Sequence, residues 1–449
     1  MTQGKPVSHI ISFALPLMAG NVFQQLYTVV DTMIVGKALG VDALAALGAS
    51  DWLNWMMLGI VQGLTQGFAI QMAQDFGAGH IKRLRKTVGN SVILAVLSAV
   101  FLLFTGEMAA APMLAFLHTP NEITGNALLY LRIMFAGVPI VMSYNMLASI
   151  LRALGDGKTP LRAMIVASLA NIGLDLLFVL GFHWGIAGAA AATLIAQMIS
   201  SIFCLWNIRK ISILSCKKED FRLQALTAGR LFVLGLPMAF QNSIISVGGM
   251  IVQTVVNGFG VIFIAGFTAT NKLYGVLEIA ATSYGYAMTT YVGQNMGAGE
   301  YTRIRKGVRS ALLVAMLTSA VIALCMLLLG RGILGFFLSG SEQVVEQAMK
   351  IAYRYLAIMS ICLPVLYLLH IIRSALQGMG NTVLPMASGI AEFVMRALTA
   401  LFLPRMIGES GIFYAEVMAW AGADAILVCS YFYVLRDIVK KAFIDKAEN

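Results

Sequence analysis

The sequence predicts an all-α polytopic membrane protein, with twelve transmembrane helices in two six-helix lobes related by a pseudo-two-fold axis along the membrane normal. Hydrophobic residues make up 59% of the 449 residues and charged residues only 12%, which excludes a set of soluble domains. Apolar runs of about 20 residues, long enough to cross a bilayer, follow one another along nearly the whole chain. These runs are continuous rather than alternating, which argues against a β-barrel.

Twelve apolar segments account for almost the whole length of the chain. Their expected ranges are 10–36, 45–70, 88–110, 123–146, 161–182, 185–207, 230–256, 261–287, 308–330, 346–370, 382–404 and 412–435. The first segment is predicted to be a retained helix rather than a signal peptide, because Pro16 and Asp31 interrupt it and a small-residue cleavage motif is missing.

The distribution of basic residues predicts the orientation of the chain. Of the 31 Lys and Arg residues, 23 fall in the tails or in the even-numbered connections, counted from a cytoplasmic N-terminus. Positive charge accumulates on the cytoplasmic side, so both termini are predicted to be cytoplasmic, in a multi-pass protein of the plasma (inner) membrane. The net charge of +10 is therefore interpreted as orienting charge rather than as a nucleic-acid-binding surface.

The two halves of the chain repeat one another. The segment QDFGAGHIKRLRKTV at 74–88 recurs 220 residues later as QNMGAGEYTRIRKGV at 294–308, and Pro16 has a counterpart in Pro237. Six spans per copy give both copies the same orientation, and we expect substrate to be handled where the lobes meet. The predicted division is an N-lobe at 1–208, a polar cytoplasmic linker at 209–229 and a C-lobe at 230–449.

An acidic site is predicted in the N-lobe alone. Asn171 and Asp175 are four residues apart in the apolar fifth span, so they share one helix face, and Asp31 lies in the first span. An acid at mid-membrane costs roughly 2.5 to 3.5 kcal/mol, which makes a functional role the default interpretation. The internal repeat aligns Val252 with Asp31 and Ala400 with Asp175.

Depth along the helices groups these acids with Thr193 of the sixth span. Two carboxylates, an amide oxygen and a hydroxyl are suitable ligands for a small cation, or form a polar cage in which one Asp is protonated. For Asn171 and Thr193, structural hydrogen bonding between helices is the alternative. Pro16 leaves a carbonyl without its usual donor, so either a static kink or a conformational bend is expected near it.

The C-lobe carries other charges within its apolar segments. Lys272 and Glu278 of the eighth span are candidates for a cavity-facing pair that contacts substrate. Glu392 and Arg396 are four residues apart and are most simply interpreted as a neutralising helix pair. The sequence assigns no role to Glu416 and Asp424 of the twelfth span.

Signatures of enzymes and of cofactor sites are weak. The five histidines form no HExxH or paired ligand spacing, and GKT at 157–159 lacks the first glycine of a P-loop, because position 152 is Arg. The five cysteines are scattered without CxxC spacing and indicate neither a disulfide framework nor a metal site. We therefore expect no enzyme and no cofactor, and we expect pumping to depend on a gradient of Na⁺ or H⁺.

Taken together, the motifs resemble the multidrug and toxic compound extrusion (MATE) family over essentially the entire chain. The resemblance rests on the first span with Pro16 and Asp31, the two GAG loops, GDGKTP before the fifth span, NIGLD at 171–175 and the Thr193 helix. It implies a cation site for Na⁺ or H⁺ at Asp31, Asn171, Asp175 and Thr193, and a drug cavity that includes Gln24 and Asn145. Some members carry a carboxylate in the seventh span, whereas this chain has none between Arg230 and Phe259.

The resemblance implies efflux of organic, often cationic and apolar drugs or xenobiotics by cation-coupled antiport. The expected partners are these small molecules and the lipid bilayer, with no nucleic acid, and the expected state is a monomer. A lipid-linked oligosaccharide flippase of the same superfamily is the alternative, although its pyrophosphate would call for a cavity ringed with Arg and Lys. A gated channel or receptor is disfavoured by the duplicated lobes with one ion site. The sequence decides neither Na⁺ against H⁺ nor the physiological substrate.

Overall fold

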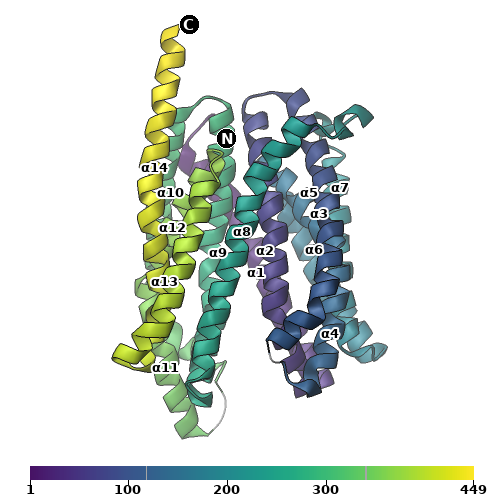
Figure 1. Cartoon of the computed structure of the whole chain (residues 1–449), viewed down its shortest axis with the longest axis vertical. Coiled ribbons are helices and arrows are strands. Elements are labelled where there is room, and N and C mark those ends of the chain that lie inside the picture. The colour runs from purple at the N-terminus through teal and green to yellow at the C-terminus, as the bar shows by residue number, and fades with distance from the viewer. Residues whose placement is uncertain (118, 339–340, 449) are drawn as a thin grey trace. The chain divides into compact units, whose positions relative to one another are not determined.

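The computed structural model describes residues 1–117, 119–338 and 341–448, which form helices and turns without a β-strand (Figure 1). A π-helix, Leu176–Gly181, continues α6, and 3₁₀ turns cover Ser212–Leu214, Lys218–Phe221 and Glu409–Tyr414. The α-helices are α1 Pro6–Leu39, α2 Val41–Gly77, α3 Ile81–Phe116, α4 Asn121–Ala136, α5 Val138–Ala153, α6 Lys158–Asp175, α7 Gly185–Ile208, α8 Ala225–Asn257, α9 Val261–Gly297, α10 Tyr301–Gly335, α11 Glu342–Ile361, α12 Leu363–Gly378, α13 Val383–Ile407 and α14 Ala415–Glu448.

These helices form the twelve membrane-crossing columns that the sequence predicts. Within the described ranges, nine helices are long and apolar enough to cross a bilayer, and two bent pairs, α4 with α5 and α11 with α12, raise the number to eleven. The remaining column is α9, which at Val261–Gly297 is as long as the other spans but is not among the helices that qualify by apolar composition. The fourth and tenth columns are therefore bent rather than straight, by 47° and 48°. Pro139 and Pro364 follow the two breaks and have no N–H with which to continue the hydrogen-bond ladder.

The internal duplication is visible in the backbone as well as in the sequence. The matching turns between α2 and α3 and between α9 and α10 place Gly79 and Gly299 at φ +70° and +72°. Gly155 and Gly380, before α6 and α13, lie at φ +90° and +88°. Because a Cβ disfavours this left-handed region, glycine is needed at the same point of both copies. The two bent columns occupy equivalent places in the two halves.

Two compact units make up the chain. The N-terminal unit is Leu15–Ser243, and the C-terminal unit combines Met1–Ala14 with Ile244–Asn449. The unit boundaries therefore fall inside α1, just before Pro16, and inside α8. The predicted lobe boundaries at 208 and 230 lie instead at either end of the linker.

A seam of small residues brings two helices of the N-terminal unit into backbone contact. Gly63 and Gly67 of α2 face Ala239 and Gly235 of α8, and a Cβ added at either glycine of α2 would lie 2.4 Å from backbone atoms of α8. One turn earlier, Asn242 donates a hydrogen bond to the carbonyl oxygen of Gly59 over 2.9 Å. Such spacing of glycines lets membrane helices pack at close range.

The polar linker after α7 is docked against α3. Arg85 Nε donates to the Ile213 carbonyl oxygen over 2.8 Å, and the backbone N–H of Gln224 donates to Asn90 Oδ1 over 2.8 Å. The carbonyl oxygen of Asp220 occupies the space into which a Cβ on Gly89 would project. Burial, reinforced by the nearby Asp220, raises the pKa of the Cys216 thiol, and Arg85 partly opposes this shift.

The outer surface of the helices is apolar, as a bilayer requires. Large side chains such as Phe104 of α3 and Leu317 and Leu328 of α10 are exposed. Water-soluble proteins rarely expose contiguous apolar surface on this scale. The chain is therefore a multi-pass membrane protein.

Candidate cation-binding site

The structure brings Asp31 of α1 and Asp175 of α6 together in the N-terminal unit. Their carboxyl groups lie within hydrogen-bonding range of each other, so that one of them, when protonated, can donate to the other. Asp175 is fully buried, at 0% exposure. Among the described residues, no donor reaches either oxygen of Asp175 or the buried Oδ1 of Asp31. Two ionised carboxylates in this arrangement repel each other, so the pair either shares a proton or binds a cation.

Further buried polar atoms without partners in the described structure lie on the helix of Asp175 and on the helix that packs against it. Asn171, one turn from Asp175 on the same face of α6, is also 0% exposed, and neither end of its amide has a partner within the described part of the chain. Thr193 is half-buried on α7, which packs against α6. Gln197, one turn from Thr193, has a buried amide oxygen that likewise has no donor among the described residues. Buried polar groups are normally hydrogen-bonded, so this concentration indicates a site for a proton, a cation or water.

The helix that carries Asp175 changes its winding at that residue. The α-helix α6 ends at Asp175 and continues as the π-helix Leu176–Gly181, in which the Phe182 N–H donates to the Leu177 carbonyl oxygen over 2.8 Å. Wider turns of this kind are rare and are often found at functional sites. The apolar segment predicted at 161–182 gave no signal of this change in winding.

Sequence reasoning also missed three side chains close to the acid pair. Tyr27 of α1 and the buried Tyr130 of α4 lie within electrostatic range of both Asp31 and Asp175, and Asp51 of α2 lies within range of Asp31. The spacing of Tyr27 from Asp31, one helical turn, was an available signal. Tyr130 and Asp51 come from other helices, so their proximity depends on tertiary packing.

The remaining predicted residues of the N-lobe have varied surroundings. Gln24 is half-buried and hydrogen-bonds to the Tyr27 side chain, which places it one contact from the acid pair. Asn145 is buried on α5 and donates to the Val141 carbonyl oxygen of its own helix over 2.9 Å. Pro16 lies within α1, which is assigned as one helix from Pro6 to Leu39, so a bend at Pro16 stays a prediction.

Lys272 and Glu278, the candidate cavity-facing pair, make no salt bridge with each other among the described contacts. Glu278 of α9 contacts His370 of α12, with 3.5 Å between Oε1 and Nε2, while Lys272 is exposed. Residues six apart on a helix point in different directions, which explains why these two do not meet. Their proposed roles toward substrate stay predictions.

The pair predicted between Glu392 and Arg396 is present and belongs to a larger network. Arg396 Nη2 lies 3.0 Å from Glu392 Oε1 and 2.7 Å from Glu416 Oε2 of α14. Arg373 Nη2 of α12 lies 2.7 Å from Glu392 Oε2. Arg373, which the sequence analysis counted among cytoplasmic charges, is therefore buried inside the C-terminal unit. Its partner Glu392 lies on another helix, α13, so the burial of Arg373 could not be predicted from the local sequence pattern.

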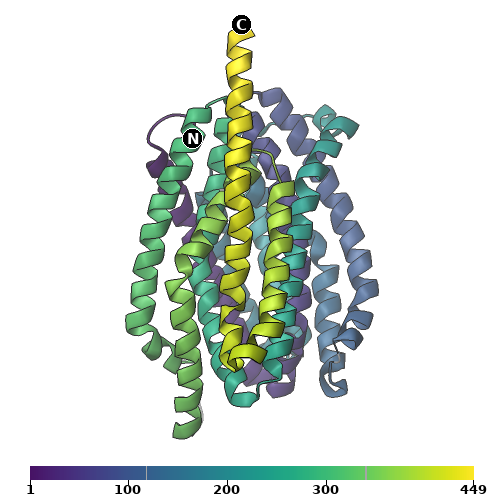
Figure 2. The ribbon, with the colours of Figure 1, turned by 60° about the vertical axis from the view of Figure 1, so that its left-hand side comes forward.

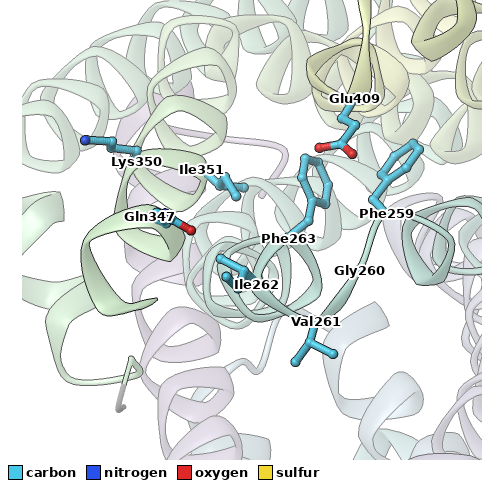
Figure 3. A pocket seen from close by; sticks show the side chains of 9 residues that line it. All are labelled: Phe259, Gly260, Val261, Ile262, Phe263, Gln347, Lys350, Ile351 and Glu409. Atoms are coloured by element: carbon cyan, nitrogen blue, oxygen red, sulfur yellow. The ribbon is translucent and has the colours of Figure 1, made fainter. Parts of the chain in front are cut away.

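A hollow of about 480 Å³ lies in the C-terminal unit (Figure 3). Its lining is mostly apolar, with Glu409 beside the rings of Phe259 and Phe263. Lys350 of α11, which also lines the hollow, forms an ion pair with Glu346. Its lining shares no residue with the acid pair or with the Arg396 network. The residues that line it are Phe259, Gly260, Val261, Ile262, Phe263, Gln347, Lys350, Ile351 and Glu409.

A duplicated bundle of membrane-crossing helices with acidic side chains buried between them defines a multi-pass membrane transporter. The MatE family model matches this chain twice, over residues 16–177 and 237–402, and the chain therefore belongs to the MatE family of transporters. The two matched segments begin at Pro16 and Pro237 and correspond to the internal repeat.

Similar proteins agree with this membership. A probable multidrug resistance protein of Bacillus subtilis, YpnP, is 30% identical over 306 residues, which cover 68% of each chain. The probable multidrug resistance protein NorM of Thermotoga maritima is 24% identical over 430 residues, which cover 93% of this chain and 89% of NorM. A solved multidrug resistance MATE family transporter in an outward-facing conformation matches the fold with a TM-score of 0.90, at 20% identity and 98% coverage of both chains.

Proposed function

We propose that this protein is a multidrug exporter that moves organic, often cationic and apolar compounds out of the cell in exchange for Na⁺ or H⁺. The observation that carries the proposal is the pair of Asp31 and Asp175, whose buried oxygens, like the Asn171 amide one helical turn from Asp175, have no hydrogen-bond donor in the described structure. The names of its relatives support the substrate class, since those proteins are called multidrug resistance proteins.

The acid pair supplies the difference in affinity that coupled transport requires. With the site free of its ion, two buried carboxylates repel each other, and separation of α1 from α6 relieves the repulsion. A proton or Na⁺ removes the repulsion and favours the arrangement in which the two groups meet. A ligand that binds one arrangement more tightly than the other shifts the equilibrium between them, so that ion entry drives drug release.

The donor set is compatible with either ion. Carboxylate, amide and hydroxyl oxygens of Asp31, Asp175, Asn171 and Thr193 are ligands that a small hard cation accepts. A shared proton between the two Asp side chains needs no further ligand. Tyr27 provides a hydroxyl within range of both acids, which is able to orient either ion.

Export from proteoliposomes under separately imposed Na⁺ and pH gradients tests this function. We expect wild-type protein to extrude ethidium under at least one gradient, and Asp31→Asn and Asp175→Asn to abolish the gradient dependence. Asp42→Asn, at an exposed carboxylate at the start of α2, is the matched control and is expected to keep wild-type transport. Wild-type rates for correctly inserted Asp31→Asn and Asp175→Asn would show that coupling does not use this pair.

The same proposal places the protein as a monomer in the plasma (inner) membrane, with both termini in the cytoplasm. The flippase alternative is less well supported by the charge arrangement. Arg373 and Arg396, both buried in the C-terminal unit, are ion-paired to Glu392 and Glu416 at 2.7 to 3.0 Å. The carboxylates of Glu392 and Glu416 cancel the charge of these two guanidinium groups, so the region offers no net positive charge to a pyrophosphate.

A further inference from the structure

The C-terminal unit buries an excess of carboxylates over guanidinium groups. Glu392 is 4% exposed and bridges Arg373 and Arg396, and Arg396 also binds Glu416. These four residues, from α12, α13 and α14, balance each other as two positive and two negative charges. Figure 2 shows α13 and α14 running side by side, as their packing requires. A further ionised carboxylate in this region would leave it with a net negative charge.

Asp424 of α14 is that further carboxylate. It is 6% exposed, and neither of its oxygens has a hydrogen-bond partner among the described residues. Asp424 lies within electrostatic range of Arg373 and Glu392. Arg373 Nη2 forms its ion pair with Glu392 Oε2 instead, at 2.7 Å. An ionised carboxylate left without donors in a buried place is strongly unfavourable, and such groups instead bind a proton or a cation.

We propose that Asp424 is a proton-binding site of the C-terminal unit, separate from the Asp31 and Asp175 pair. A proton suits this position better than a metal ion because, in the described residues, no group of three or more His, Cys, Asp or Glu side chains gathers that could hold a metal ion. A proton needs only one carboxyl oxygen.

The neighbouring charges explain what proton release at Asp424 does. Arg373 Nε is buried and has no partner in the described structure, so Arg373 is able to accept a second acidic neighbour. When Asp424 ionises, Arg373 gains a partner on α14 in competition with Glu392 on α13. Loss of the proton therefore favours the ion pair of Arg373 with Asp424, between α12 and α14, over the pair of Arg373 with Glu392, between α12 and α13. This is a change between two discrete arrangements. The charged groups within electrostatic range of Asp424 are Arg373 on α12 and Glu392 on α13. Glu392 in turn lies within range of His370 and Arg396. Glu416 on α14 lies within range of Glu392 and of Glu278 on α9.

Difference infrared spectroscopy of the purified full-length protein tests the site without any transport measurement. Asp31→Asn/Asp175→Asn is the parent, so that the carboxyl groups of the N-terminal unit do not contribute. Spectra are compared between about pH 5 and about pH 9, where exposed carboxyls with pKa values near 4 stay ionised. We expect one protonated-carboxyl band in the parent, its loss in Asp424→Asn and its displacement in Asp424→Glu. Asp437→Asn, an exposed carboxylate on the same helix, is the matched control and keeps the band.

Two outcomes overturn the inference. A protonated-carboxyl band that is unchanged in both Asp424→Asn and Asp424→Glu shows that Asp424 does not hold the proton. The exchange of partners has its own test in Glu392→Gln, which frees Arg373 to pair with Asp424 and is expected to weaken the band at the same pH. A band of full strength in Glu392→Gln refutes the exchange. Neither result depends on whether the Asp31 and Asp175 pair couples transport, so failure here and failure of the proposed function are distinguishable.

Discussion

Replacement of Gly67 by Ala should separate two helices of the N-terminal unit. The added Cβ would lie 2.4 Å from the Cα of Gly235, whereas carbon atoms pack at about 3.5 to 4.0 Å, so α2 and α8 must move apart by about 1 Å. The obstacle is backbone rather than a flexible side chain, which places the cost near the upper end of the range of about 1 to 3 kcal/mol for overpacking. Ala is favoured over Gly within a helix by about 1 kcal/mol. The expected net loss is about 2 kcal/mol.

Gly48 provides the matched control on the same helix, because nothing lies within 4 Å of a Cβ at that position. Gly48→Ala should therefore keep or raise stability, while Gly67→Ala lowers it. Thermal unfolding in detergent, followed by intrinsic fluorescence at one fixed scan rate, compares the two variants, since apparent midpoints depend on scan rate. Equal midpoints for the two variants would refute close packing of α2 against α8. Lower midpoints for both would point to a general intolerance of Ala in α2.

Two further predictions concern the linker and the buried charges. Gly89→Val should displace the linker from α3, so that Cys216 loses the burial that raises its pKa. In a variant with no other cysteine, alkylation of Cys216 at neutral pH should then become faster. Gly48→Val should leave the alkylation rate unchanged, and an equally slow rate in Gly89→Val would contradict docking of the linker on α3. Arg373→Met alone should destabilise the C-terminal unit by about 3 to 5 kcal/mol, since it breaks a buried ion pair. In a double-mutant cycle of unfolding in detergent, Arg373→Met/Glu392→Gln should recover part of this loss. Strictly additive effects of the two substitutions on stability would show that the pair at 2.7 Å is not coupled.

Local pattern was sufficient for the class of protein and for the acids. Apolar runs of bilayer length predict spans because a backbone in lipid must satisfy its own hydrogen bonds, and helices do so within one segment. The four-residue spacing of Asn171 and Asp175 predicts a shared helix face without knowledge of any neighbour. The glycines of the seam, Gly59, Gly63 and Gly67, also carried a local signal, the repeated four-residue spacing of membrane helix contacts, which the sequence analysis did not use.

What the sequence alone determined about this protein is its membrane class, its duplicated order of helices and the presence of costly acids in apolar spans. The tertiary structure decided which charges meet: Asp31 with Asp175, Glu278 with His370 rather than Lys272, and Arg373 with Glu392 inside the bundle. The physical reason is the range of the forces. Hydropathy and helix periodicity act within one segment, whereas a salt bridge depends on the distance between two side chains, which only the packing of separate helices sets.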